Sequence, residues 1–151
     1  MRRSVVLAET AFETQQKQDL LKRLRRENRE GIVFKRLDAQ YTPGRPGSGG
    51  PQLKHKFYAT CSALVFKVND KRSVELRLLA AVGWQSVGNV TIPANVAVPE
   101  AGQVVEVRYL YAFPESHALY QPVFLGLRTD VAPNECLLPQ LKYKGGEEEL
   151  C

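Results

Sequence analysis

Two short segments carry charged residues at a spacing that suits phosphate chemistry. "EGIVFKR" (residues 30–36) is an apolar run between a carboxylate and two cations, and "LKHKF" (residues 53–57) places a lysine on each side of a histidine. Side chains two apart on a strand point to the same face, so we expect Lys54 and Lys56 to point away from His55. Neighbouring ammonium groups repel unless an anion lies between them, which makes the pair a candidate phosphate cradle. The alternative is an edge strand whose lysines prevent aggregation.

The flanking sequence predicts the secondary structure around these residues. Residues 31–36 and the lysine segment read as strands, and the loop between them, "YTPGRPGSGGP" (residues 41–51), is too rich in glycine and proline for regular structure. Upstream, "SVVLAE" (residues 4–9) predicts a short strand. An amphipathic helix is expected to start at Thr10, with Glu13 completing a capping box.

Positive charge is concentrated in the N-terminal third of the chain. Residues 1–57 contain 13 Lys and Arg against 6 Asp and Glu, whereas residues 58–151 contain 8 against 10. This asymmetry favours a polyanionic partner such as nucleic acid, although a solvated basic helix face would give the same composition. The cations that we expect to contact nucleic acid are Arg25, Arg29, Lys35, Arg36 and Arg45.

From residue 58 onward the pattern changes to all-β. Five β-rich runs are separated by polar, glycine or proline turns such as "GWQS", and they span residues 59–68, 73–82, 87–92, 103–113 and 121–128. In the fourth run, Val105, Val107 and Tyr109 alternate with polar residues, as in a half-buried strand. Five strands of this length predict a Greek-key barrel of the OB type, since a β-sandwich usually has about seven.

Composition limits the remaining classes of protein. The chain has 151 residues and no apolar run near the ~18 residues that a membrane helix needs. Its three cysteines, Cys61, Cys136 and Cys151, match no zinc-ligand spacing and suggest no disulfide framework. We therefore expect a cytoplasmic, monomeric protein without a membrane segment.

Taken together, the two charged segments resemble motifs IV and V of the ATP-dependent DNA ligases, members of the covalent nucleotidyltransferase superfamily. "EGIVFK" is similar to their Glu-Gly, apolar run and Lys, and "LKHK" to the motif whose two lysines contact the nucleotide α-phosphate. "YTPGR" resembles the segment that precedes motif V in many ligases. "RTDV" (residues 128–131) is similar to part of motif VI, Arg-x-Asp-Lys, with Val131 at the lysine position.

The resemblance implies the C-terminal part of a ligase active in DNA repair. The fold would be mainly β, with a remnant of an adenylation domain at residues 1–57 and an OB-fold domain at residues 58–151. It also implies that ATP and Mg²⁺ serve the complete enzyme, with neither bound tightly by this chain alone. The partners would be nicked or double-stranded DNA and the missing N-terminal adenylation half. By resemblance, the nucleotide phosphates would be bound by Lys54, Lys56, Arg128 and Asp130, and a divalent metal by Glu30.

One departure from the family is decisive for chemistry. Ligases form a phosphoramidate between AMP and the lysine of a Lys-x-Asp-Gly motif, and no such motif occurs in these 151 residues. We therefore expect the chain to be inactive in nick sealing by itself. Two alternatives stay open: a standalone OB-fold module that binds nucleic acid without ligase chemistry, and an OB domain that docks on a protein partner. The acidic balance of residues 58–151 counts against an autonomous single-strand binder.

Overall fold

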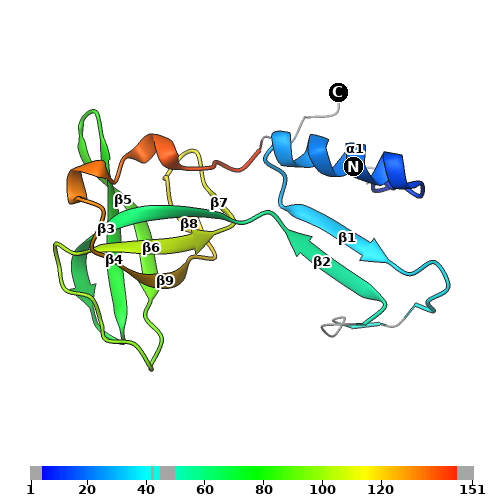
Figure 1. Ribbon diagram of the computed structural model, residues 1–151. Helices are drawn as coiled ribbons and strands as arrows, with labels where there is room; N and C mark the ends of the chain where they lie inside the picture. The colour runs from blue at the N-terminus through cyan, green and yellow to red at the C-terminus, as the bar shows by residue number, and fades with distance from the viewer. Residues whose placement is uncertain (1–4, 42, 45–49, 146–151) are drawn as a thin grey trace.

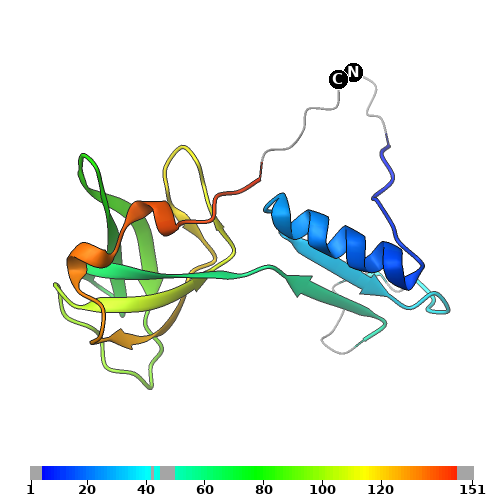
Figure 2. The ribbon, with the colours of Figure 1, turned by 45° about the horizontal axis from the view of Figure 1, so that its top comes forward.

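The computed structural model describes residues 5–41, 43–44 and 50–145. Within them, a helix and a β-hairpin form one unit, and a small β-barrel forms the other (Figure 1). The second strand of the hairpin leads into the first strand of the barrel through only two residues, Phe57 and Tyr58. Figure 2 shows the helix lying across one face of the hairpin, away from the barrel.

The helix, α1 (Thr14–Arg26), begins later than the sequence predicts. The side chain of Gln16 accepts a hydrogen bond from the backbone N–H of Glu13 (3.3 Å), which places the helix start at Glu13. The hydroxyl of Thr10 donates instead to a carbonyl two residues before it (3.0 Å), so the predicted capping box is wrong. The predicted N-terminal strand is also wrong over residues 5–9, which have no regular secondary structure and are exposed. A strand needs a partner, and no described strand runs beside this segment.

The hairpin pairs β1 (Gly31–Lys35) with β2 (Gln52–Lys56) in antiparallel register. At the end of the hairpin away from its loop, the backbones of the two strands lie unusually close together. A Cβ on Gly31 would lie 2.3 Å from the carbonyl oxygen of His55 and 2.9 Å from the Cα of Lys56. Only glycine therefore fits at the first position of β1, which explains the Gly of the Glu-Gly pair.

The barrel contains the five strands that the sequence predicts. They are β3 (Ala59–Asn69), β4 (Ser73–Ala80), β5 (Gly83–Thr91), β6 (Val104–Tyr109) and β9 (Val123–Arg128). All neighbours are antiparallel, in the order β5-β4-β3-β6-β9, and β5 lies next to β9. A three-strand meander followed by a return to its first strand is the partly open Greek-key barrel of an OB fold. The predicted fold class is thus confirmed.

Smaller elements complete the barrel. A two-stranded sheet, β7 (Tyr111–Ala112) with β8 (Leu119–Tyr120), joins β6 to β9. Two 3-10 helices, Pro133–Glu135 and Leu138–Gln140, follow β9. The turn predicted at "GWQS" is wrong, because Ala81 and Val82 make the turn and Trp84 already pairs with Leu79 inside the sheet. No helix in the described part of the chain is long and apolar enough to span a membrane.

The barrel core follows the alternation seen in the sequence. Val105, Val107 and Tyr109 on β6 have no exposed surface, as predicted for the buried face of a half-buried strand. Cys61 and Cys136 lie in the same core, where burial raises the pKa of their thiols to about 12 and about 11. Both thiols are therefore protonated at neutral pH and act as small apolar side chains.

Candidate functional site

The hairpin collects three lysines on one face. In the register of β1 and β2, Val33 is opposite Lys54, Gly31 is opposite Lys56 and Lys35 is opposite Gln52. Residues directly opposite each other, and those two apart along a strand, share a face. Lys35, Lys54 and Lys56 therefore lie on one side of the hairpin, which we call the lysine face.

The other side of the hairpin is covered by α1. His55 points to this side, where the guanidinium of Arg25 lies 3.3 Å from its Nε2 atom. The ring of Phe57 completes the cluster, edge-on to His55 at 5.6 Å between ring centroids and 5.2 Å from the Arg25 guanidinium carbon. The alternation inferred from "LKHKF" thus separates two ammonium groups from a histidine that is part of the helix–hairpin packing.

Lys56 connects the lysine face to two other groups. Its ammonium lies 3.5 Å from a carboxylate oxygen of Glu30, the residue just before β1. It also donates a hydrogen bond to the side-chain oxygen of Gln121, from the segment between β8 and β9 (3.2 Å). The side chain of Lys56 is 27% exposed and remains reachable by a ligand. Among the described residues, Lys54 forms no ion pair.

The described residues alone do not make a metal site. No group of three or more His, Cys, Asp and Glu side chains within them lies close enough together to hold an ion. Glu30 is a single carboxylate already facing an ammonium group, whereas Mg²⁺ prefers six oxygen ligands, often shared with phosphates. The metal role of Glu30 stays a prediction, and it requires ligands from outside the described residues.

The other predicted nucleic-acid contacts are scattered. Arg36 makes two hydrogen bonds to Asp38 (3.1 and 2.8 Å), and Arg29 donates to Glu27 (3.4 Å). Arg25 lies on the helix side of the hairpin, opposite the lysine face. Arg45 lies outside the described residues. Of the four cations within the described residues, only Lys35 shares a face with Lys54 and Lys56.

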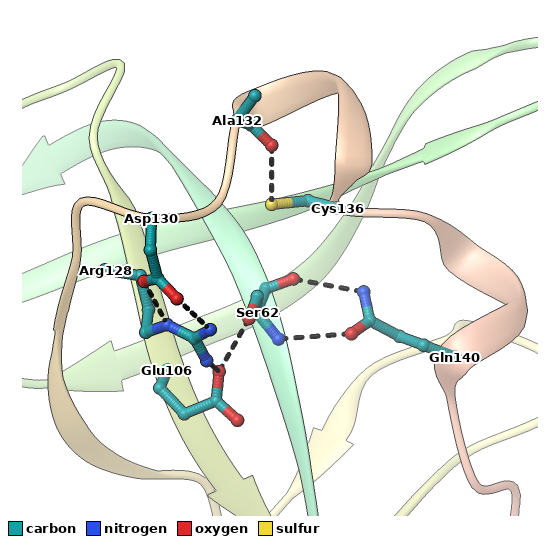
Figure 3. A network of polar contacts seen from close by, with 7 residues as sticks. All are labelled: Ser62, Glu106, Arg128, Asp130, Ala132, Cys136 and Gln140. Atoms are coloured by element: carbon teal, nitrogen blue, oxygen red, sulfur yellow. Dashed lines mark hydrogen bonds and ion pairs between the residues drawn. The ribbon is translucent and has the colours of Figure 1, made fainter.

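Arg128 and Asp130 form a polar network on the barrel (Figure 3). The guanidinium donates to both carboxylate oxygens of Asp130 (2.8 Å each) and to Glu106 on β6 (3.0 Å). The same Glu106 oxygen accepts a hydrogen bond from the hydroxyl of Ser62 (2.6 Å). The network ties β3, β6 and the end of β9 together, with the Arg128 side chain 34% exposed.

This network is remote from the lysine face. Gln121, which contacts Lys56, precedes β9, whereas Arg128 is its last residue. At ~3.3 Å per residue, the start and end of this six-residue strand are roughly 17 Å apart. The structure therefore brings Glu30 to Lys56 but does not bring Arg128 and Asp130 to either. Gln121 is a contact that the sequence reasoning missed, and no sequence signal marks it because it comes from the other unit.

The Arg128–Asp130 pair makes a testable electrostatic prediction. Hydrogen bonds from Arg128 lower the pKa of Asp130 to about 2. Because the folded-state pKa lies below that of the unfolded chain, the pair stabilises the fold above the ordinary carboxyl range, and this contribution is lost as the pH falls toward 2. In a ¹³C NMR titration we expect the Asp130 carboxyl to titrate near pH 2, and its midpoint to rise toward the ordinary value of ~3.9 in Arg128→Gln. A wild-type midpoint near 4 would contradict the geometry.

The aromatic side chains of the barrel are mostly structural. Tyr109 is fully buried, and its hydroxyl accepts a hydrogen bond from the backbone N–H of Lys142 (2.9 Å). Tyr111 is 7% exposed and stacks on Tyr120, with 4.9 Å between ring centroids. Trp84 is more open, at 37% exposed.

Comparison with proteins of known structure shows which fold the chain has. No protein-family model matches the chain, and no curated protein matches it in sequence. A Lig E DNA ligase of known structure matches 80% of this chain with a TM-score of 0.57 and 18% identity. The chain shares its fold with DNA ligases. The protein designated Pmar-Lig_Pre matches 78% of the chain with a TM-score of 0.59 and 18% identity.

The chain corresponds to only part of each of these proteins. The chain spans 48% of the Lig E ligase and 32% of Pmar-Lig_Pre. The ligase domain of M. tuberculosis LigD is 24% identical over 78% of the chain, at a TM-score of 0.46, which adds nothing to the fold assignment. The ligase-like fold expected from the motifs is confirmed, whereas the roles of individual residues stay predictions.

Proposed function

We propose that this chain is the C-terminal part of an ATP-dependent DNA ligase, which binds nicked duplex DNA, contributes phosphate contacts to nick sealing and is not catalytically complete alone. The observation that carries the proposal is the lysine face, which holds Lys54 and Lys56 side by side next to Glu30 on a ligase-like fold. The motif resemblance assigns these same lysines to a nucleotide α-phosphate, and their shared orientation is what such contacts require.

The proposal assigns different roles to the two lysines and to the Arg128–Asp130 pair. Lys54 and Lys56 neutralise the α-phosphate of the nucleotide, and charge-assisted hydrogen bonds from two ammonium groups fix its position. AMP transfer bonds this α-phosphate to the 5′-phosphate of the nick, so without nucleotide the same two ammonium groups are available to that terminal phosphate. ATP and Mg²⁺ belong to the complete enzyme, where the nucleotide supplies the adenylyl group. Arg128 and Asp130 would act only after the barrel moves toward the nucleotide, since the network now lies at the far end of β9. The covalent lysine must come from the other half.

The exposed apolar side chains of the hairpin unit support the proposal that an adenylation half packs against it. Neither α1, β1 nor β2 contains a buried residue. Val33, Phe34 and Leu53 are 48%, 47% and 51% exposed, although all three lie in strands. A two-stranded sheet is marginally stable at best in water. These side chains lie on both faces of the hairpin, and the adenylation half predicted from the motifs would pack against them and continue the sheet.

A second candidate, a standalone OB-fold module, is favoured by two exposed aromatic residues beside arginines. The guanidinium of Arg77 lies 3.3 Å from the ring centroid of Phe66, which is 44% exposed. Arg108 lies 4.4 Å from the ring of Tyr58, which is 46% exposed. Aromatic and cationic side chains together are how OB folds bind single strands.

Fluorescence anisotropy with three labelled DNAs separates the two candidates. The probes are a duplex with a 5′-phosphorylated nick, the same duplex with a 5′-hydroxyl nick, and the single strand. A ligase part prefers the phosphorylated nick. Preference for the single strand, with weaker binding in Phe66→Ala, would favour the standalone module instead. The intact mass of the endogenous protein then tests completeness, since a ligase requires an upstream Lys-x-Asp-Gly in the same or a partner polypeptide.

A further inference from the structure

The two units of the chain touch at few places. Only two residues, Phe57 and Tyr58, join β2 to β3, and we call them the link. None of the described helices and strands of the hairpin unit packs broadly against a barrel strand. Within the described part of the chain, one side-chain hydrogen bond crosses between the two units, from Lys56 to Gln121 (3.2 Å). A connection this small does not by itself fix the orientation of one unit against the other.

Residues 141–145, which we call the strap, leave the barrel and run back to α1 (Figures 1 and 2). The strap is bonded firmly to the barrel. The backbone of Ala112 donates to the carbonyl of Lys142 (2.8 Å) and accepts from the N–H of Lys144 (2.9 Å). Leu141 is buried in the barrel core, and Lys142 donates its N–H to the hydroxyl of Tyr109 (2.9 Å).

The same strap also contacts the hairpin unit and the link. The ammonium of Lys142 donates a hydrogen bond to the carbonyl of Phe57, the first residue of the link. Burial lowers the pKa of this amine, consistent with its position between the units. The N–H of Gly145 donates to the carbonyl of Asn28, just after α1 (3.4 Å). A Cβ at Gly145 would lie 2.3 Å from the carbonyl oxygen of Glu27, so the strap rests directly on the helix end.

We propose that the strap is a latch that holds the hairpin unit, and with it the lysine face, in one orientation against the barrel. It is anchored on β7 at one end and on the C-terminal end of α1 at the other, and Lys142 fixes the link between these anchors. Release of the Gly145 end leaves the barrel anchors intact, so the link becomes a hinge. The latch goes beyond the proposed function and does not depend on it, because its contacts involve no ligand.

Gly145→Ala tests the latch. The added methyl group clashes with the carbonyl of Glu27, so the strap must lift from α1 while its bonds to Ala112 persist. The matched control is Gly126→Ala, because a Cβ on Gly126 in β9 meets no atom within 4 Å. The measurement is ¹⁵N relaxation of the backbone amides of the full chain, which gives a rotational correlation time for each unit separately.

We expect one common correlation time for both units in the wild type and in Gly126→Ala, and two different times in Gly145→Ala. Lys142→Met is a second variant, which keeps the aliphatic stem but removes the ammonium group; it should also separate the two times. The proposal is overturned if both strap variants keep the common time, or if the wild type already tumbles as two bodies. DNA binding does not enter this test, so its outcome is independent of the ligase proposal.

Discussion

Lys54→Gln together with Lys56→Gln is expected to abolish the preference of the chain for a 5′-phosphorylated nick over a 5′-hydroxyl nick. The two ammonium groups lie on one face of β2, where both reach a single phosphate. Charge-assisted hydrogen bonds contribute about 1.5–3 kcal/mol each when well formed and less at an exposed site. We therefore expect a loss of about tenfold in affinity, equivalent to about 1.4 kcal/mol, for the phosphorylated nick. Anisotropy titrations at fixed salt measure this change.

A matched loss of charge on the barrel is the control for this experiment. Lys67 on β3 and Lys71 in the following turn are both exposed, and Lys67 lies roughly 26 Å along the strand from Ala59. Lys67→Gln with Lys71→Gln removes the same two charges, so it lowers long-range attraction to DNA equally but leaves the preference for the phosphate. An equal effect of both pairs on that preference would show that the lysine face acts only through net charge.

Gly31→Ala is expected to destroy the pairing of β1 with β2. A Cβ at this position would lie 2.3 Å from the carbonyl oxygen of His55, which is backbone and cannot rotate away. The strands must separate at their open end, and this displaces Glu30 from Lys56. Because the hairpin has no buried side chain of its own, nothing compensates. Hydrogen exchange should show protection lost in β1 and β2 and retained in β3 to β6.

The same control, Gly126→Ala, separates a steric effect from a general intolerance of alanine for glycine. The side chain added in β9 meets no neighbouring atom, so protection throughout the chain should match the wild type. If Gly31→Ala leaves the amides of β1 and β2 as protected as before, the close approach of the two strands in the structure is wrong.

Local pattern predicted the five barrel strands because alternating residues of each strand face the core. The period-two alternation of Val105, Val107 and Tyr109 comes directly from the pleat, and the structure buries all three. The predicted N-terminal strand is wrong because strand formation also depends on a partner. Val5, Val6 and Leu7 have high strand propensity, yet a strand exists only beside a partner, and the described residues provide none there.

The candidate site likewise has one feature that local sequence predicts and others that depend on the folded structure. Alternation alone predicts that Lys54 and Lys56 face away from His55, because this depends only on the geometry of one strand. The partners of these lysines come from elsewhere in the chain. Glu30 reaches Lys56 through strand pairing, and Gln121 reaches it across the gap between the units. No propensity or spacing rule encodes a contact between residues 65 positions apart.

The class of fold, the five strands of the barrel and the shared face of the two lysines could be predicted from local sequence. These features depend on side-chain periodicity and turn chemistry, which act over a few neighbouring residues. Two features follow only from the packing of the folded chain: Arg128 binds Asp130 and Glu106 far from the lysine face, and Gly145 rests on the end of α1. Such contacts depend on how whole elements pack, and packing joins residues that the chain keeps far apart.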